Sequence, residues 1–527
     1  MSDEASTAHQ DIATDSTQTV SPPTLTPVSL DQRINALDIL RGFALMGILL
    51  MNIEWFGRPI GEISTFNLEL TGLDHAAGWL IRCFVEGKFY KLFALLFGMG
   101  FAVMLTQAMR KDRPFGAWFT RRMLVLFVFG LAHMFFLWQG DILHDYALAG
   151  LLLLGLIYLL RKKRFEKYNN PNSILKLALW WLCVPMLMAT LAGVGFGAFV
   201  DRQSLTEQWQ KSQVVRGLVS QLETDAAENK ASPEGPQDEL LADSADVLLE
   251  AGEADEAEEA ETTPDLAQDN TDAAEQQDEP KAEEEQTPQE QAQEIFEYEQ
   301  ELAQNSANEI AALKDGTYWQ ATVFRTKASI EWLAFSPFFA LTMLMPIFLL
   351  GYWLVISGAI KNHVQHPKLF GYMARIGLGV GLFITVGGLS IMGHPAVKQV
   401  MPLQGVGNVL FMGGQFFMAA GYLGMVIRLL DSPKWYNWLV KLAPMGRMAL
   451  TNYIMHSVIA TSIFYGYAGG LYGDISRAPQ MLIVLAILAI QIPLSSWWLT
   501  HFQFGPLEWL WRSLTYKKWQ AFRVAPH

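Results

Sequence analysis

Apolar stretches long enough to cross a lipid bilayer recur along most of this chain and constrain its fold more than any other feature. A helix needs about 20 predominantly apolar residues to span the hydrocarbon core. We expect ten such helices, at residues 37–56, 87–108, 118–138, 142–161, 175–200, 331–357, 369–391, 407–429, 448–468 and 478–500. The predicted fold is an all-α, polytopic membrane helix bundle, which suits a chain that is 51% hydrophobic.

Basic residues predict the orientation of these helices. The stretches "RKDRPFGAWFTRR", "RKKRFEKY", "KNHVQHPK" and "RLLDSPKWYNWLVK" follow the second, fourth, sixth and eighth helices. Cytoplasmic loops of membrane proteins carry an excess of Lys and Arg, so we expect a protein of the cell (inner) membrane with both termini in the cytoplasm. The polar first 30 residues lack the basic and apolar regions of a cleavable signal, so the first helix is expected to stay as an anchor.

A strongly acidic segment separates two membrane halves. Residues 201–315 hold 33 Asp plus Glu against 6 Lys plus Arg, a net charge of −27, whereas the whole chain carries −14. Most of this segment lacks the apolar content for a core and is predicted to be disordered, with a helix near 288–313. It is either a solvating insert or a surface for a partner or cations. The expected organisation is a disordered cytoplasmic N-terminus (1–32), a membrane half (33–200), the acidic outer loop (201–315), a second membrane half (316–518) and a cytoplasmic tail (519–527).

The first apolar stretch, "LDILRGFALMGILLMN" (37–52), carries charged residues at its inner end. At about 100° per residue, Arg41 lies about 60° and Asn52 about 40° from Asp38, so the three share one helix face. Charged groups inside membrane helices usually face the bundle interior or a water-filled cavity and mark a substrate path. The sequence therefore predicts a polar stripe across the bilayer. The alternative is an Asp38–Arg41 ion pair, with Asn52 bonded to a neighbouring helix.

A second polar cluster lies in "WQGDILHDYALAG" (138–150). Asp141, His144 and Asp145 fall on one helical face, where two carboxylates could orient the imidazole and raise its basicity. This pattern is typical of a general base. The competing interpretation is that Asp141 caps the helix and His144 lies at the interface. No second histidine lies at ligand spacing here, so no metal site is expected.

A third motif is "GRMALTNYIMHS" (446–457), in which Asn452 and His456 are one turn apart. Arg447 lies at the cytoplasmic end, where it could pair with the phosphates of a cytosolic cofactor. Interhelical hydrogen bonding is the alternative use of Asn452. Cys83 and Cys183 lie in or beside apolar segments, which favours packing over a disulfide.

Five ordered stretches carry a resemblance to a known family: "LDILRGFALMGILLMNI", "KFYKLFALLFGMGF", "GDILHDYALAG", "GRMALTNYIMHS" and "GPLEWLWRSLTY". In order and spacing they resemble the YeiB-like bacterial integral membrane proteins, whose C-terminal half is a domain of unknown function. The resemblance covers residues from about 33 to 518 except the acidic loop. The YeiB-like family is in turn similar to transmembrane acyltransferases, among them sugar O-acyltransferases and the lysosomal heparan glucosaminide N-acetyltransferase.

The wider resemblance implies a location for the catalytic base. In the O-acylating enzymes a required His stands fifteen positions after the Leu that corresponds to Leu37, and this chain has Asn52 there. This chain resembles the N-acetylating enzymes at that position, because they also have Asn there. In those enzymes a catalytic His follows in the next outer segment. His75 in "GLDHAAGW" is the positional candidate for that His. The chain thus departs from the O-acylating pattern at the base.

The resemblance implies transfer of an acyl group from cytosolic acyl-CoA to an envelope glycan or lipid acceptor. Asp38, Arg41, Arg447 and Asn452 would form the cofactor side of the site, and Asn52, His75, His144 and Asp145 the catalytic, acceptor side. The base would deprotonate the acceptor, and Asn52 would donate to the developing oxyanion. The alternatives are a transporter or flippase that uses the same polar stripe, and a non-catalytic envelope scaffold. The lipid bilayer is an expected partner. No nucleic-acid partner is expected.

Overall fold

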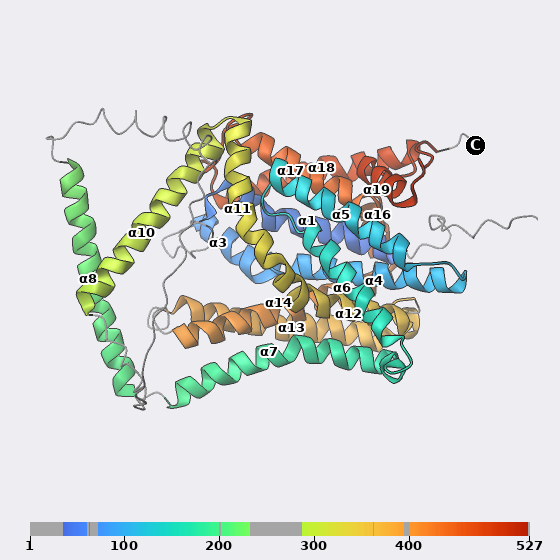
Figure 1. The fold of residues 1–527 in the computed structure, drawn as a ribbon, viewed down its shortest axis with the longest axis horizontal. Coiled ribbons are helices and arrows are strands. Elements are labelled where there is room, and N and C mark those ends of the chain that lie inside the picture. The colour runs from blue at the N-terminus through green and yellow to red at the C-terminus, as the bar shows by residue number, and fades with distance from the viewer. Residues whose placement is uncertain are drawn as a thin grey trace, which may run out of the picture. The chain divides into compact units, whose positions relative to one another are not determined.

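The computed structural model describes residues 35–60, 63, 72–199, 202–231, 287–361, 363–394 and 401–524. Across these ranges the regular structure is helical and contains no β-strand, as Figure 1 shows. The predicted N-terminal segment 1–32 lies outside the described residues. The chain divides into two compact units, a membrane unit that joins residues up to 199 with those from 306 onward, and a smaller unit of residues 200–305.

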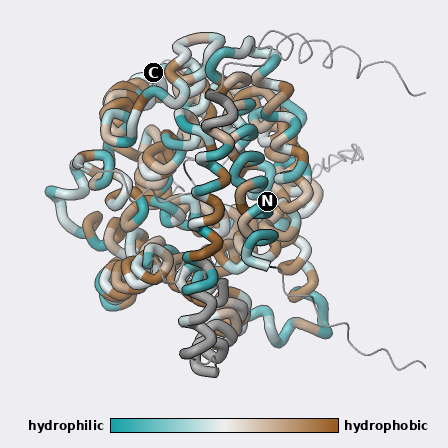
Figure 2. The backbone as a smooth tube through the Cα atoms, turned by 90° about the vertical axis from the view of Figure 1, so that its left-hand side faces the viewer, coloured by the Kyte–Doolittle hydropathy of each residue, from teal (hydrophilic) through white to brown (hydrophobic). Residues whose placement is uncertain are grey.

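Nine helical stretches in the described ranges are long and apolar enough to cross a membrane, which confirms the predicted all-α membrane bundle. They are α1 (Asn35–Gly57), Gly72–Arg110 with α3 (Gly72–Leu80) and α4 (Lys88–Arg110), α5 (Gly116–Phe136), α6 (Leu143–Leu160), most of α7 (Pro171–Phe199), Tyr318–Ile356 with α11 (Tyr318–Phe339) and α12 (Met345–Ile356), α13 (Pro367–Gly393), most of α14 (Met401–Leu430), and α18 (Arg477–His501). Hydrophobic residues recur along these helices (Figure 2).

Two of these stretches are longer than the sequence indicates because π-helical turns continue them where breaks were expected. The π-helical turn Ile81–Val85 continues α3 in the direction of α4. Gly87, at φ +75°, permits the change of direction before α4. Ala340–Leu344 joins α11 to α12 three residues after Pro337. Proline removes one backbone donor from a helix, and a wider turn accommodates that loss.

The ninth expected span, 448–468, is shorter than predicted. It forms α17 (Ala449–Phe464), whose 16 residues follow the short α16 (Ala443–Arg447) and a break at Met448. At 1.5 Å per residue α17 is about 24 Å long, below the roughly 30 Å of a bilayer core. The amphipathic α19 (Pro506–Tyr516) then packs beside α17 and α5.

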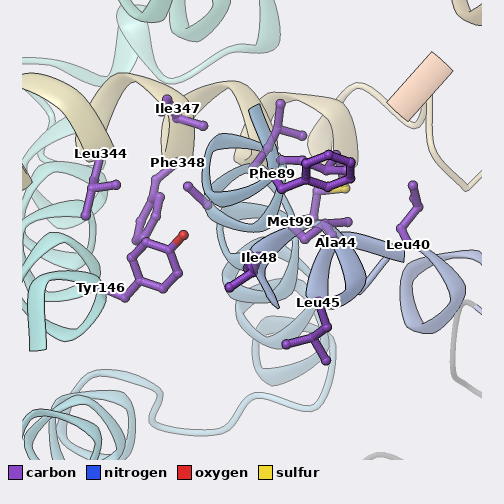
Figure 3. Close-up of a cluster of buried hydrophobic side chains, with 14 of the residues drawn as sticks. Leu40, Ala44, Leu45, Ile48, Phe89, Met99, Tyr146, Leu344, Ile347 and Phe348 are labelled. Carbon is purple, nitrogen blue, oxygen red and sulfur yellow. The ribbon is translucent and has the colours of Figure 1, made fainter. Parts of the chain in front are cut away.

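Helix α1 lies at the centre of the membrane unit, where it packs against α4, α16, α17 and α18. Small residues allow these close approaches: a Cβ on Gly446 would meet the Asp38 carbonyl oxygen, and one on Gly98 would meet that of Phe348. Figure 3 shows part of the buried core, in which Tyr146 of α6 faces Phe348 of α12 with ring centroids 5.6 Å apart. The polar groups described below lie inside this apolar framework.

The smaller unit contains two helices of the acidic segment. The expected helix near 288–313 corresponds to α10 (Pro288–Ile310). Helix α8 (Arg202–Ala231) was not expected in a segment predicted to be mostly disordered. Val215 and Val219 of α8 pack against Ala292 of α10, and this pairing supplies apolar burial that α8 alone lacks. Residues 232–286, on which the rest of the disorder prediction falls, lie outside the described residues.

Candidate functional site

A cavity of about 270 Å³ lies among α1, α4, α5, α6, α17 and α19 in the membrane unit. One end is charged and the other apolar. Along α1 its wall extends from Leu37 to Ile48, a rise of about 16 Å along the helix axis. The cavity therefore follows the helix with the predicted polar stripe, and two residues of that stripe, Asp38 and Arg41, lie at its charged end.

Four arginines surround the charged end: Arg41, Arg122, Arg447 and Arg512. Arg41 donates to Asp38 at 2.7 Å, which confirms the ion pair that the sequence allowed. The other three form no ion pair with any described residue. Arg122 instead lies over the Trp511 ring, 3.6 Å from its centroid, a cation–π contact that holds the guanidinium in place.

Glu508 is the second carboxylate at this end, and its oxygens are already engaged. It accepts hydrogen bonds from the backbone amides of Leu450 and Thr451 and from the Thr451 hydroxyl, so it caps the first turn of α17. Burial raises the pKa of this carboxyl, although these hydrogen bonds oppose the shift. With Asp38 paired and Glu508 used as a cap, the charged end of the cavity has an excess of positive charge.

Apolar and aromatic side chains close the opposite end of the cavity, among them Ile48, Phe93, Leu143, Tyr146 and Tyr453. The Tyr146 hydroxyl donates to the Tyr90 carbonyl oxygen at 2.7 Å and leaves its ring facing the cavity wall. Figure 3 shows Ile48 and Tyr146 within the same buried group. The cavity thus combines a cationic mouth with an apolar interior, a combination that suits a ligand with an anionic head and a less polar tail.

A buried histidine–aspartate cluster lies next to the apolar end. Oδ1 of Asp141 lies 2.8 Å from His133 Nδ1, and Oδ2 of Asp141 lies 2.9 Å from His144 Nδ1. On the far side of each ring, Nε2 of His133 lies 2.7 Å from the Ser457 hydroxyl and Nε2 of His144 lies 2.8 Å from that of Ser336.

Asp141 orients both rings through their Nδ1 atoms. It lies between α5 and α6, where burial favours the neutral acid but the hydrogen bonds from His133 and His144 outweigh burial and lower its pKa. An ionised Asp141 accepts from both Nδ1–H groups. The Ser457 hydroxyl has no other partner among the described contacts and can donate to His133 Nε2, whereas the Ser336 hydroxyl donates to the Trp332 carbonyl oxygen. Asp145 completes the cluster, with Oδ1 3.4 Å from His144 Nε2.

The cluster is adjacent to the cavity without lining it. His133, His144 and Asp145 are at most 2% exposed. Tyr453 lines the cavity on one side and packs against His133 on the other, with ring centroids 5.3 Å apart. Leu143, the residue before His144, also lines the cavity. The Tyr453 ring therefore lies between the apolar end of the cavity and the His133 imidazole.

The remaining predicted site residues lie elsewhere. Asn52 is 7% exposed, and neither it nor the half-buried His75 of α3 lines this cavity. A second cavity of about 230 Å³ lies near the end of α1 and contains the Glu54–Arg477 ion pair, with Nε and Oε1 3.1 Å apart. Its lining also excludes Asn52 and His75. The structure therefore does not bring the four expected catalytic residues together.

Asn452 and His456 form interhelical contacts. The Asn452 side chain donates to the Met445 carbonyl oxygen and to Ser495 of α18, at 3.2 and 3.1 Å. His456 Nε2 lies 2.7 Å from Gln491 Oε1, also on α18. Neither lines the cavity, so Asn452 follows the interhelical alternative rather than the cofactor role.

Sequence analysis missed three members of these groups. Arg122 and Arg512 lie in "FTRRML" and "LWRSLTY", and neither was predicted to be a site residue. His133 lies in the apolar run "LAHMFF", eight residues before its partner Asp141 and across a turn from it. A charged or imidazole side chain inside an apolar run is the signal that could have identified all three.

Comparison with known proteins addresses the predicted family. Residues 354–518 match a family described as "Protein of unknown function (DUF418)". The chain is 27% identical over 502 residues to "Uncharacterized protein YxaH" of Bacillus subtilis (strain 168), which covers 94% of this chain and 97% of that protein. It is also 23% identical over 488 residues to "Uncharacterized protein YeiB" of Escherichia coli (strain K12), with 92% and 96% covered.

The chain is similar to YeiB and YxaH over nearly its whole length. The matches extend through both membrane halves, so the similarity includes the elements that carry the cavity as well as the C-terminal domain. No solved structure matches the chain significantly.

Proposed function

We propose that this YeiB-like protein transfers an acyl group from acyl-CoA, bound at the arginine end of the cavity, to an acceptor at the opposite membrane face. The observation that carries the proposal is the continuity of the site: a cationic mouth, an apolar passage and a histidine–aspartate cluster follow one another along the membrane unit. In this proposal the mouth faces the cytoplasm of a cell (inner) membrane, because the basic segments lie at the same helix ends.

The mouth suits the phosphates of coenzyme A. Arg122, Arg447 and Arg512 form no ion pair with a described residue, and guanidinium groups bind phosphate oxygens through charge-assisted, often bidentate hydrogen bonds. Arg41 already has Asp38 as a partner and is expected to contribute less. The apolar walls beyond the arginines would receive the pantetheine arm and the acyl group, which lack charge.

The histidine–aspartate cluster supports the chemical step. In this proposal Asp141 holds His133 at Nδ1, and the ring acts as a general base through Nε2. The thioester would reach these rings once Tyr453 changes rotamer, since this ring lies between the cavity and His133. Asn52 and His75 are not needed in this form of the proposal.

A transporter or flippase is the second candidate, and one observation favours it. The imidazoles do not line the cavity, so an anionic amphiphile could occupy the cavity without reaching a reactive group. Under this alternative the arginines would bind a phosphate-bearing headgroup, and the protein would move the ligand without breaking a bond.

Ligand binding and thioester turnover distinguish the two functions. Purified protein in lipid nanodiscs is titrated with acetyl-CoA, palmitoyl-CoA and free CoA by calorimetry, and release of free CoA is then followed with a thiol reagent. Arg122→Gln and Arg447→Gln should each weaken binding about 10- to 100-fold, as expected when a hydrogen bond to a charged group is lost. Arg375→Gln, an exposed arginine on α13, is the matched control and should bind normally.

The outcomes separate the candidates. Binding together with CoA release supports acyl transfer. Binding without CoA release supports the flippase if the protein also moves a labelled anionic lipid across the membrane of liposomes. These liposomes have the same lipid composition as the nanodiscs. Absence of any acyl-CoA binding by folded wild-type protein would overturn the acyltransferase proposal.

A further inference from the structure

Two serines, Ser457 and Ser336, lie at the ends of the histidine–aspartate cluster. Ser457 Oγ, His133 Nε2, His133 Nδ1 and Asp141 Oδ1 are connected by successive contacts of 2.7 and 2.8 Å. In a Ser–His–Asp triad the serine contacts Nε2 and the carboxylate contacts Nδ1, and this is the order observed here. An ionised Asp141 fixes the tautomer in which His133 Nε2 accepts the serine proton.

The Ser457 hydroxyl is directed at the imidazole rather than at the backbone. Serine and threonine hydroxyls in helices commonly donate to the carbonyl oxygen four residues earlier. Ser462 on the same helix does so toward Val458, and Ser336 does so toward Trp332. Among the described contacts Ser457 Oγ has only His133 as a partner, and it is 1% exposed.

Ser457 is also close to the end of the cavity. Leu450 and Tyr453 of α17 line the cavity, and at about 100° per residue Ser457 lies on the same face of that helix. It follows Tyr453 by one turn, about 6 Å along the helix axis. A thioester that advanced past the Tyr453 ring would therefore meet the Ser457 hydroxyl next.

We propose that the acyl group is carried on Ser457 as a serine ester between donor and acceptor, a step that rests on the proposed acyltransferase function. In the first half-reaction Ser457 Oγ bonds to the acyl carbon, the carbon–sulfur bond breaks, and the serine proton passes through His133 Nε2 to the departing CoA sulfur. In the second, His133 takes a proton from the acceptor hydroxyl or amine, the acceptor bonds to the acyl carbon, the ester bond from the acyl carbon to Ser457 Oγ breaks, and His133 returns the proton to Ser457 Oγ.

This division into two steps explains how one buried cluster could serve both membrane faces. Coenzyme A can leave before the acceptor binds, so the two ligands need not occupy the site together. Covalent catalysis of this kind gives ping-pong kinetics and an acyl-enzyme that accumulates when the second substrate is absent.

The test uses full-length protein in nanodiscs without an acceptor. Wild-type protein is incubated with acetyl-CoA and isotopically labelled CoA, and label appearing in acetyl-CoA reports the reversible first half-reaction. Acid-quenched samples are digested, and mass spectrometry locates the acetyl group. We expect exchange by the wild type, acetylation of the peptide that contains Ser457, and at least a hundredfold loss of exchange in Ser457→Ala.

Two further variants guard against a folding defect. Ser457→Cys keeps the size of the side chain and should retain an acetyl group as a thioester that hydroxylamine releases. Ser462→Ala removes an exposed hydroxyl from the same helix and should exchange at the wild-type rate. Size-exclusion profiles and circular dichroism of every variant confirm the fold.

Failure of this inference differs from failure of the proposed function. Labelled acetyl groups entering membrane lipid or glycan without CoA exchange, or with Ser457→Ala as active as wild type, would overturn the serine ester and leave acyl transfer intact. Absence of both exchange and transfer in folded wild-type protein would overturn the proposed function, and the serine ester with it.

Discussion

At the scale of single residues, Asp141 contributes most to the order of the buried cluster. It accepts from both imidazoles and from the His144 backbone amide, and Gly130 leaves the room for this approach, because a Cβ there would lie 2.7 Å from Asp141 Oδ2. Asp145 contacts a single imidazole, with Oδ1 3.4 Å from His144 Nε2, beside the Ser336 hydroxyl. The two carboxylates lie four residues apart in one sequence motif but differ in structural importance.

Asp141→Asn is therefore expected to destabilise the protein more than Asp145→Asn. The amide can accept from only one imidazole, so one charge-assisted hydrogen bond is lost and a buried ring nitrogen is left without its partner, a change of about 2 to 3 kcal/mol. Thermal unfolding of the two variants in the same detergent measures the difference. An equal or larger loss in Asp145→Asn would contradict this assignment of roles.

At the scale of helices, glycine positions determine how closely α4 approaches α12. A Cβ on Gly98 would meet the backbone of Phe348, and a Cβ on Gly351 would meet that of Leu95, so the two glycines lie against each other's helix. Small residues permit this close packing of membrane helices. The neighbouring Gly100 instead lines the cavity beside Arg41.

Gly98→Ala should destabilise the membrane unit by about 1 to 3 kcal/mol, because backbone atoms cannot move aside as a flexible side chain would. Gly155→Ala on α6 is the control: nothing lies within 4 Å of its added Cβ, so the higher helix propensity of alanine should leave stability unchanged or slightly raised. Fluorescence-detected thermal unfolding of both variants provides the measurement. Equal behaviour of the two variants would show that the close approach is not maintained.

Helix positions were largely predictable from the sequence because apolar length alone identifies a membrane span. Nine expected spans have counterparts among the described helices, whereas α17 is too short and α8 was not expected. The candidate site was predictable only in part. Asp38, Arg41 and Arg447 interrupt or border apolar runs, but His133 and its partners Asp141 and Ser457 meet through tertiary packing, which no local spacing reveals.

At the scale of the whole molecule, membrane orientation determines which substrates can reach the arginine end of the cavity. The proposal requires this end to face the cytoplasm, where acyl-CoA is present. The basic segments after α4, α6, α12 and α14 favour that orientation. It also implies that α8 and α10 of the acidic segment lie on the external side, because α7 ends at the opposite face from the basic segments.

Cysteine labelling of intact cells tests this orientation. In a background with Cys83→Ser and Cys183→Ser, Thr224→Cys on α8 should react with a membrane-impermeant maleimide added from outside, since Thr224 is exposed. Lys434→Cys, an exposed position on the short α15 (Pro433–Leu439) after α14, should react only once the cells are permeabilised. The reversed pattern would place the arginine mouth outside the cell, away from acyl-CoA, and would favour an external anionic ligand for the same cavity.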